Sequence, residues 1–205
     1  MAFALVESGK ITKMMNGNKG IKIGDIQYPS SFFTTVYSEA ERNAAGVYTI
    51  EIDETNRKNE EWYINTNITY SYDSSAKKVK GTYGTATAKA HADTTYTNTD
   101  KSNGIIPTGK DVGDVKDEGL KTILIRQVKA EAKSKLDATD WYVTRKSEEG
   151  TAIPSAITTH RKAVRTKQAE METAITNAAD TAALETLYKR GDNNERPLGD
   201  LPNLE

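Results

Sequence analysis

The chain has 205 residues, of which 36% are hydrophobic, and its 28 Lys and Arg nearly balance 29 Asp and Glu for a formal charge of -1. This balance gives no electrostatic case for binding nucleic acid, and the absence of Cys excludes disulfides, thiolate catalysis and Cys-based zinc sites. With only two His residues, we expect no metal site and no cofactor.

No apolar run approaches the roughly 20 residues that span a bilayer. The N-terminal sequence MAFALVESGK has neither a basic n-region nor a long apolar stretch, so it does not resemble a signal peptide. We therefore expect a soluble protein, without membrane contact, that is made in a cytoplasm.

Residues 1–96 are predicted to form a β-rich domain with short helices. Short strands are expected at 3–6, 20–24 and 47–52, where apolar residues are spaced as in half-buried strands. Ser38 is a predicted N-cap because acidic residues follow it, and Gly46 is predicted to end that helix in the left-handed region.

An aromatic and β-branched stretch from Trp62 to Tyr72 predicts one strand, and the segment 78–83 predicts its hairpin partner. Alternation would place Trp62, Ile64 and Tyr70 on one face. Tyr side chains on this hairpin could stack on sugars, so a glycan-binding module is a less favoured alternative function.

The helices are predicted in the C-terminal half, which makes the fold class α+β. Residues 97–114 are expected to be a linker, 115–190 an αα-hairpin with a short further helix, and 191–205 an extended tail. Apolar residues recur on one face of each long helix, namely Leu120, Leu124, Val128, Ala132 and Leu136, then Ile157, Val164, Met171, Ile175 and Ala178.

Motifs of enzyme active sites are missing. Neither a G-x-S-x-G elbow nor a phosphate-binding loop occurs. His160 is expected to be a partly exposed helical side chain, and His91 has no second ligand nearby. We therefore expect that the protein is not an enzyme and has no catalytic, cofactor-binding or metal-binding residues.

The loop of the helical hairpin carries a pattern of short motifs. It runs Thr139-Asp140-Trp141, then Pro154, then His160-Arg161 and Val164-Arg165. This pattern resembles the Thr-Asp-Trp … Pro … Tyr-Arg … Leu-Arg signature of tailed-phage tail assembly chaperones and fibre-associated proteins. In this chain His160 stands where Tyr is usual.

The N-terminal half and the C-terminus look like parts of the same phage proteins. The similar segments are Val6-Glu7-Ser8-Gly9, Lys19-Gly20-Ile21, Ile26-Gln27-Tyr28-Pro29 with Phe33, Ser38-Glu39-Ala40-Glu41-Arg42, Gly46-Val47-Tyr48 and Arg196-Pro197-Leu198-Gly199. Together with the hairpin pattern, they spread the resemblance over most of the chain.

The residues of the hairpin pattern have predicted structural roles. Trp141 is expected to fold back over the open end of the hairpin, while Thr139 and Asp140 cap backbone donors. Arg161 and Arg165 lie four apart on one helix face and are expected to pair with a carboxylate near the loop.

The resemblance implies a non-enzymatic structural component of a phage tail, baseplate or fibre-attachment region that connects larger virion proteins. The alternative is a tail-fibre assembly chaperone that is absent from the mature virion. Expected partners are other tail, baseplate or fibre proteins, with multiple copies in a symmetric assembly. The expected docking residues are Trp141, Asp140, Arg161, Arg165, Leu198 and Leu201.

Overall fold

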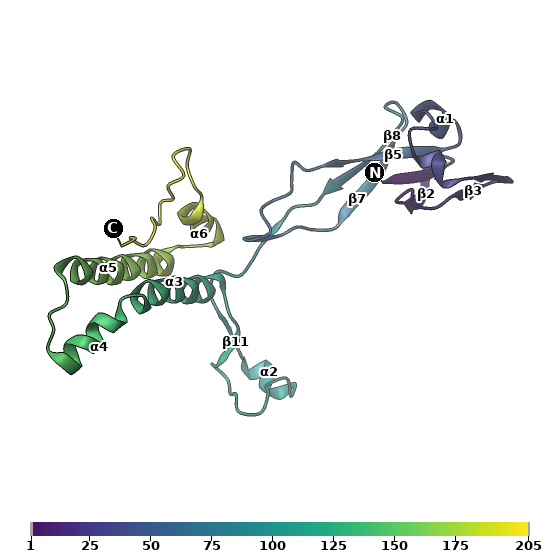
Figure 1. Cartoon of the computed structure of the whole chain (residues 1–205). Helices are drawn as coiled ribbons and strands as arrows, with labels where there is room; N and C mark the ends of the chain where they lie inside the picture. The colour runs from purple at the N-terminus through teal and green to yellow at the C-terminus, as the bar shows by residue number, and fades with distance from the viewer. Residues whose placement is uncertain (1, 205) are drawn as a thin grey trace. The chain divides into compact units, whose positions relative to one another are not determined.

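The computed structural model describes residues 2–204 and divides the chain into two compact units at residues 87 and 88. Strands dominate the first unit and helices the second, which confirms the α+β class (Figure 1). The division falls before the predicted boundary at residue 96. Residues after 88 belong with the helices because Ala90 O accepts a hydrogen bond from Leu120 N, and Asp93 Oδ1 accepts one from Gly119 N.

A five-stranded sheet in the order β2-β1-β5-β8-β7 forms the first unit. Its strands are β1 (Phe3–Glu7), β2 (Lys10–Met15), β5 (Val47–Asp53), β7 (Ile68–Asp73) and β8 (Lys78–Tyr83). Neighbouring strands are antiparallel except β5 and β8, which are parallel. Residues 54–77 provide the long connection that a parallel pair requires, and they include β6 (Tyr63–Ile64), which pairs with β9 (Thr87–Ala88).

Both faces of β1 are buried, because successive side chains point to opposite faces of a sheet. Phe3 and Leu5 pack in one cluster with Phe32 of the 3-10 helix η1 (Ser30–Phe33). The hairpin of β3 (Ile21–Ile23) and β4 (Ile26–Tyr28) covers the same face. Ala4 and Val6 pack on the opposite face with residues of β5 and β8.

Helix α1 (Glu39–Ala44) begins and ends as the sequence predicts. Ser38 Oγ accepts a hydrogen bond from Glu41 N, and the Glu41 carboxylate accepts one from Ser38 N. The Ser38 hydroxyl also donates to the Glu41 carboxylate, and this bond, together with the one from Ser38 N, holds the pKa of Glu41 below its ordinary value. Gly46 follows the helix with φ +78°, in the left-handed region that only glycine adopts at little cost.

The single strand predicted from Trp62 to Tyr72 is wrong in its first half. Trp62 and Tyr63 are buried, whereas Ile64 is 59% exposed, so the expected alternation fails. The Asn65 side chain binds both N and O of Lys58, and the chain bends there before β7 begins. The hairpin of β7 and β8 is confirmed.

Residues 97–114 form an ordered hairpin excursion instead of a linker. β10 (Thr94–Thr95) pairs with β11 (Val115–Asp117), and α2 (Asn98–Ser102) lies between them. Asp100 stabilises this excursion twice, because its carboxylate caps α2 at Thr97 and pairs with Lys116 at 2.8 Å.

The predicted helix pair is present, but a third helix occupies most of the expected loop. The long helices α3 (Leu120–Asp137) and α5 (Ser155–Asn177) pack side by side, and α4 (Asp140–Glu149) lies between them in sequence (Figure 1). The predicted apolar faces are confirmed, since their buried members include Leu124, Val128, Ala132, Ile157, Val164, Met171 and Ile175. Pro154 is the N-cap residue of α5, without a side-chain hydrogen bond.

The C-terminal segment folds back onto the helices of its own unit. After α6 (Thr181–Tyr188), Leu198 N donates to Leu187 O, and the Leu198 and Leu201 side chains are buried. Asp200 accepts two hydrogen bonds of 3.1 Å from Arg190 and pairs with Arg196 at 2.9 Å. The described part of the tail thus contains no helix or strand, and it docks on its own unit and not on a partner.

We predict that Asp200 makes the second unit less stable in acid. Hydrogen bonds from Arg190, and then the charge of Arg196, hold the pKa of Asp200 below its ordinary value. A lowered folded-state pKa contributes stability above the unfolded value of about 3.9, and this contribution is lost as the pH falls through the folded-state pKa. The difference in free energy of unfolding between wild type and Asp200→Asn should therefore shrink as the pH falls below about 4. A difference that stays constant in urea titrations across that range would contradict the role of Asp200.

Candidate partner-docking site

A buried arginine joins α5 to the corner between α3 and α4. Arg161 is only 8% exposed, and its Nη1 lies 2.8 Å from Leu136 O, 2.7 Å from Thr139 Oγ1 and 2.8 Å from Asp140 Oδ1. Leu136 O is one of the last carbonyls of α3, which have no partner within the helix. Arg161 therefore caps the end of α3 and pairs with the first residue of α4.

This corner confirms one predicted contact and corrects two details. Arg161 does pair with a carboxylate near the loop, that of Asp140. Thr139 does not cap a backbone donor; its hydroxyl donates to Leu136 O instead. His160, expected to be partly exposed, is buried like Arg161. The two side chains lie on the α5 face that meets the rest of the unit, which the seven-residue apolar spacing alone did not indicate.

Trp141 does not fold over the end of the hairpin. Its side chain is 52% exposed, and α4 contains no buried residue. The Arg145 guanidinium lies 4.7 Å from the Trp141 ring centre and 5.6 Å from that of Tyr142. The expectation of a buried ring is wrong because the Arg161 contacts already close the corner without it.

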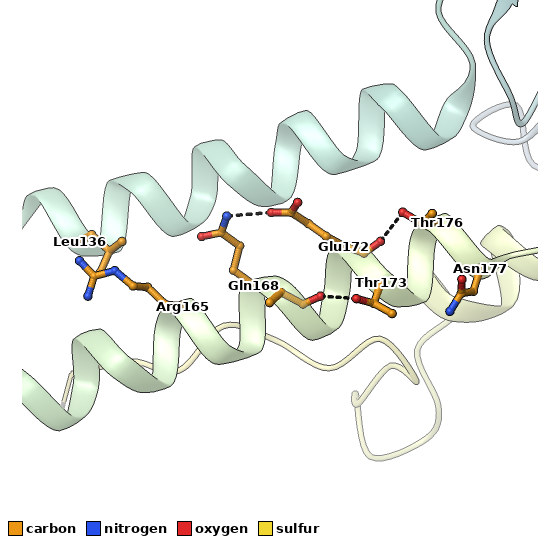
Figure 2. Close-up of a pocket in the computed structure, with 8 residues that line it drawn as sticks. Leu136, Arg165, Gln168, Glu172, Thr173, Thr176 and Asn177 are labelled. Atoms are coloured by element: carbon orange, nitrogen blue, oxygen red, sulfur yellow. Dashed lines mark hydrogen bonds between the residues drawn. The ribbon is translucent and has the colours of Figure 1, made fainter.

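Arg165 was expected to pair with a carboxylate but lies instead on an open groove along α5. Figure 2 shows Arg165 beside Leu136 at one end of this groove and Asn177 at the other. Arg165 has no hydrogen bond or ion pair with any of residues 2–204. Other polar groups of the groove are engaged, since Gln168 donates to Glu172 at 2.7 Å and the Thr176 hydroxyl donates to Glu172 O.

Leu198 and Leu201 cannot serve as free docking residues. They are 3% and 4% exposed, and they are buried within their own chain. They were expected to dock on a partner, whereas the surface that buries them belongs to their own chain. Of the six expected docking residues, Trp141 and Arg165 are the ones that lie on the surface without a bonded partner in the described chain, while Asp140 and Arg161 bind each other.

Other kinds of site receive no support from the described residues. Within residues 2–204, no group of three or more His, Asp or Glu residues is placed to hold a metal ion. In the same range, no helix is long and apolar enough to cross a membrane. Comparison with protein-family models, with curated proteins and with solved structures found no match to this chain.

We predict that replacing Arg161 by Ala destabilises the fold, whereas replacing Arg165 by Ala has little effect on stability. Arg161→Ala leaves Leu136 O, Thr139 and Asp140 without their shared donor and should lower the free energy of unfolding by about 2–4 kcal/mol. Arg165→Ala, one helical turn away, should change it by less than about 0.5 kcal/mol because Arg165 is exposed. Urea unfolding followed by circular dichroism at the helix band measures both. Equal effects of the two variants would contradict the capping role of Arg161.

We also predict that Trp141→Ala leaves the fold almost unchanged. Because the ring is half exposed and α4 buries no side chain, the loss should be below about 1 kcal/mol. Met171→Ala is the control, since removal of a buried Met side chain costs about 2–5 kcal/mol. A Trp141 variant as unstable as the Met171 variant would mean that the ring belongs to the core.

Proposed function

We propose that this protein is a non-enzymatic structural component of a phage tail, baseplate or fibre-attachment region, where it connects larger virion proteins. The proposal starts from the resemblance of the hairpin pattern, the N-terminal half and residues 196–199 to phage tail and fibre-associated proteins. It assigns the protein to the virion, with other tail, baseplate or fibre proteins as its partners.

The observation that carries the docking role is the exposed Trp141 on a rigidly anchored corner. Trp is enriched among the residues that dominate binding energy at protein interfaces. Here Trp141 directly follows Asp140, which the buried Arg161 holds in place. A large apolar side chain fixed in this way loses little conformational freedom on binding, which favours recognition.

The division into two units supports a connecting role. Each unit has its own buried residues: Phe3 and Val47 in the first, Val164 and Leu184 in the second. Each can therefore present a separate surface to a different partner.

The glycan-binding alternative loses its main support. Trp62 and Tyr63 are buried, and Tyr72 packs against Tyr48 with ring centres 4.6 Å apart. These three side chains are therefore not available as a stacking platform, although Tyr70 of the same hairpin is 40% exposed.

Mass spectrometry of purified particles tests the proposal against the assembly chaperone. Particles of the phage that encodes this chain should contain it at a fixed ratio to the other tail proteins. Washing the particles in high salt should leave that ratio unchanged. If the protein is abundant in infected cells and absent from mature particles, the structural role is wrong and the chaperone is favoured.

A further inference from the structure

Helix α4 ends in a run of charged side chains that the described chain leaves unpaired. Arg145, Lys146, Glu148 and Glu149 have no ion pair or hydrogen bond from their side chains to residues 2–204. The Nε atom of Arg145 is also buried without a hydrogen-bond partner.

These side chains share a face with the exposed tryptophan. At 3.6 residues per turn, positions i, i+4, i+7 and i+8 lie on one side of a helix. Trp141, Arg145, Glu148 and Glu149 occupy those positions in α4. The face is thus aromatic and positive in its first half and negative in its second half.

Arg145 and Glu149 do not form an ion pair with each other within α4. Arg145 and Glu149 are four residues apart, but with the cation before the anion, which is the weaker order for a helical pair. Side chains in a helix lean toward its N-terminus, and the Arg145 guanidinium accordingly lies over the Trp141 ring at 4.7 Å. Glu149 is left without a cation.

We propose that this α4 face binds the same face of a second copy of the chain. The inference rests on the docking face of the proposed function and names its occupant. In an antiparallel pair with a twofold axis near the level of Ser147, Arg145 of each copy meets Glu149 of the other. A twofold contact requires a surface that is complementary to itself, and the separation of charge along α4 meets that requirement.

Two further features favour the antiparallel arrangement. The dipoles of the two helices then run in opposite directions, so their like-charged ends do not lie together as they would in a parallel pair. Trp141 of one copy reaches the level of Ile153 of the other, just beyond the end of α4. A parallel pair would instead place Arg145 against Arg145 and Glu149 against Glu149.

The size of the face predicts a weak contact. A helix of ten residues is about 15 Å long, so its face is smaller than the roughly 800 Å² per partner of a stable interface. We expect a dissociation constant on the order of 100 µM, which becomes effective where other contacts hold the copies close together.

Charge reversal in the full chain tests the inference without an outside partner. Arg145→Glu alone sets acid against acid, and Glu149→Arg alone sets base against base, so each should weaken self-association at least about tenfold in sedimentation equilibrium. An equimolar mixture of the two variants should associate like wild type, because both crossed contacts are then attractive. The double variant with both reversals should also associate like wild type.

Controls separate charge complementarity from damage to the fold. Lys162→Glu changes the same kind of charge on an exposed position of α5 and should leave association unchanged. Circular dichroism should be the same for all variants, since the reversed residues have no bonded partner in the described chain. Trp141→Ala should weaken association about thirtyfold, because Trp side chains contribute strongly to binding energy at protein contacts.

Several outcomes would overturn the inference. A wild-type chain that stays monomeric across concentrations around 100 µM, or a mixture that associates no better than its components, excludes pairing through this face. If such a chain is nevertheless found in mature particles, the proposed function stands and α4 binds another virion protein. If the chain pairs through α4 but is absent from particles, the inference stands and the proposed function fails.

Discussion

The second unit depends on the buried guanidinium of Arg161. It gives the end of α3 a hydrogen-bond donor, and it holds the start of α4 through Asp140. Burying a charge is costly unless it is paired and hydrogen-bonded, and here three acceptors surround one nitrogen.

Periodicity and capping rules predict those parts of this fold that depend on neighbours in sequence. The apolar face of α3 follows from its four-residue spacing, and the capping box at Ser38 follows from local hydrogen bonding. The pairing of Arg161 with a carboxylate near the loop could also be anticipated, because the loop offers Asp140 close to the start of the second long helix.

The wrong predictions have a different cause, because they concern contacts between segments that are distant in sequence. Burial of Leu198 and Leu201, exposure of Trp141 and the break after Tyr63 all depend on which distant segment reaches each residue, and one sequence does not contain that information. A Trp in an amphipathic helical pattern can be exposed or buried, and the residues next to it in sequence do not distinguish the two cases. The sequence predicts a linker where the ordered segment around α2 lies, because the stability of this segment comes from Asp100 contacting Thr97 and Lys116, with little apolar burial.

A rigid corner that carries a small contact face is well suited to an assembly of many copies. Because the Arg161 contacts fix the start of α4 without the help of Trp141, binding at α4 need not reorganise the helix pair. A face that is weak alone prevents free copies from aggregating, whereas copies held on a common support gain an effective concentration far above the dissociation constant. The opposite signs of Arg145 and Glu149 then select one orientation between neighbours, because a parallel arrangement brings like charges together. Specificity at such a contact comes mainly from repulsion between like charges in the wrong arrangements. Affinity comes from the many copies that are held close together.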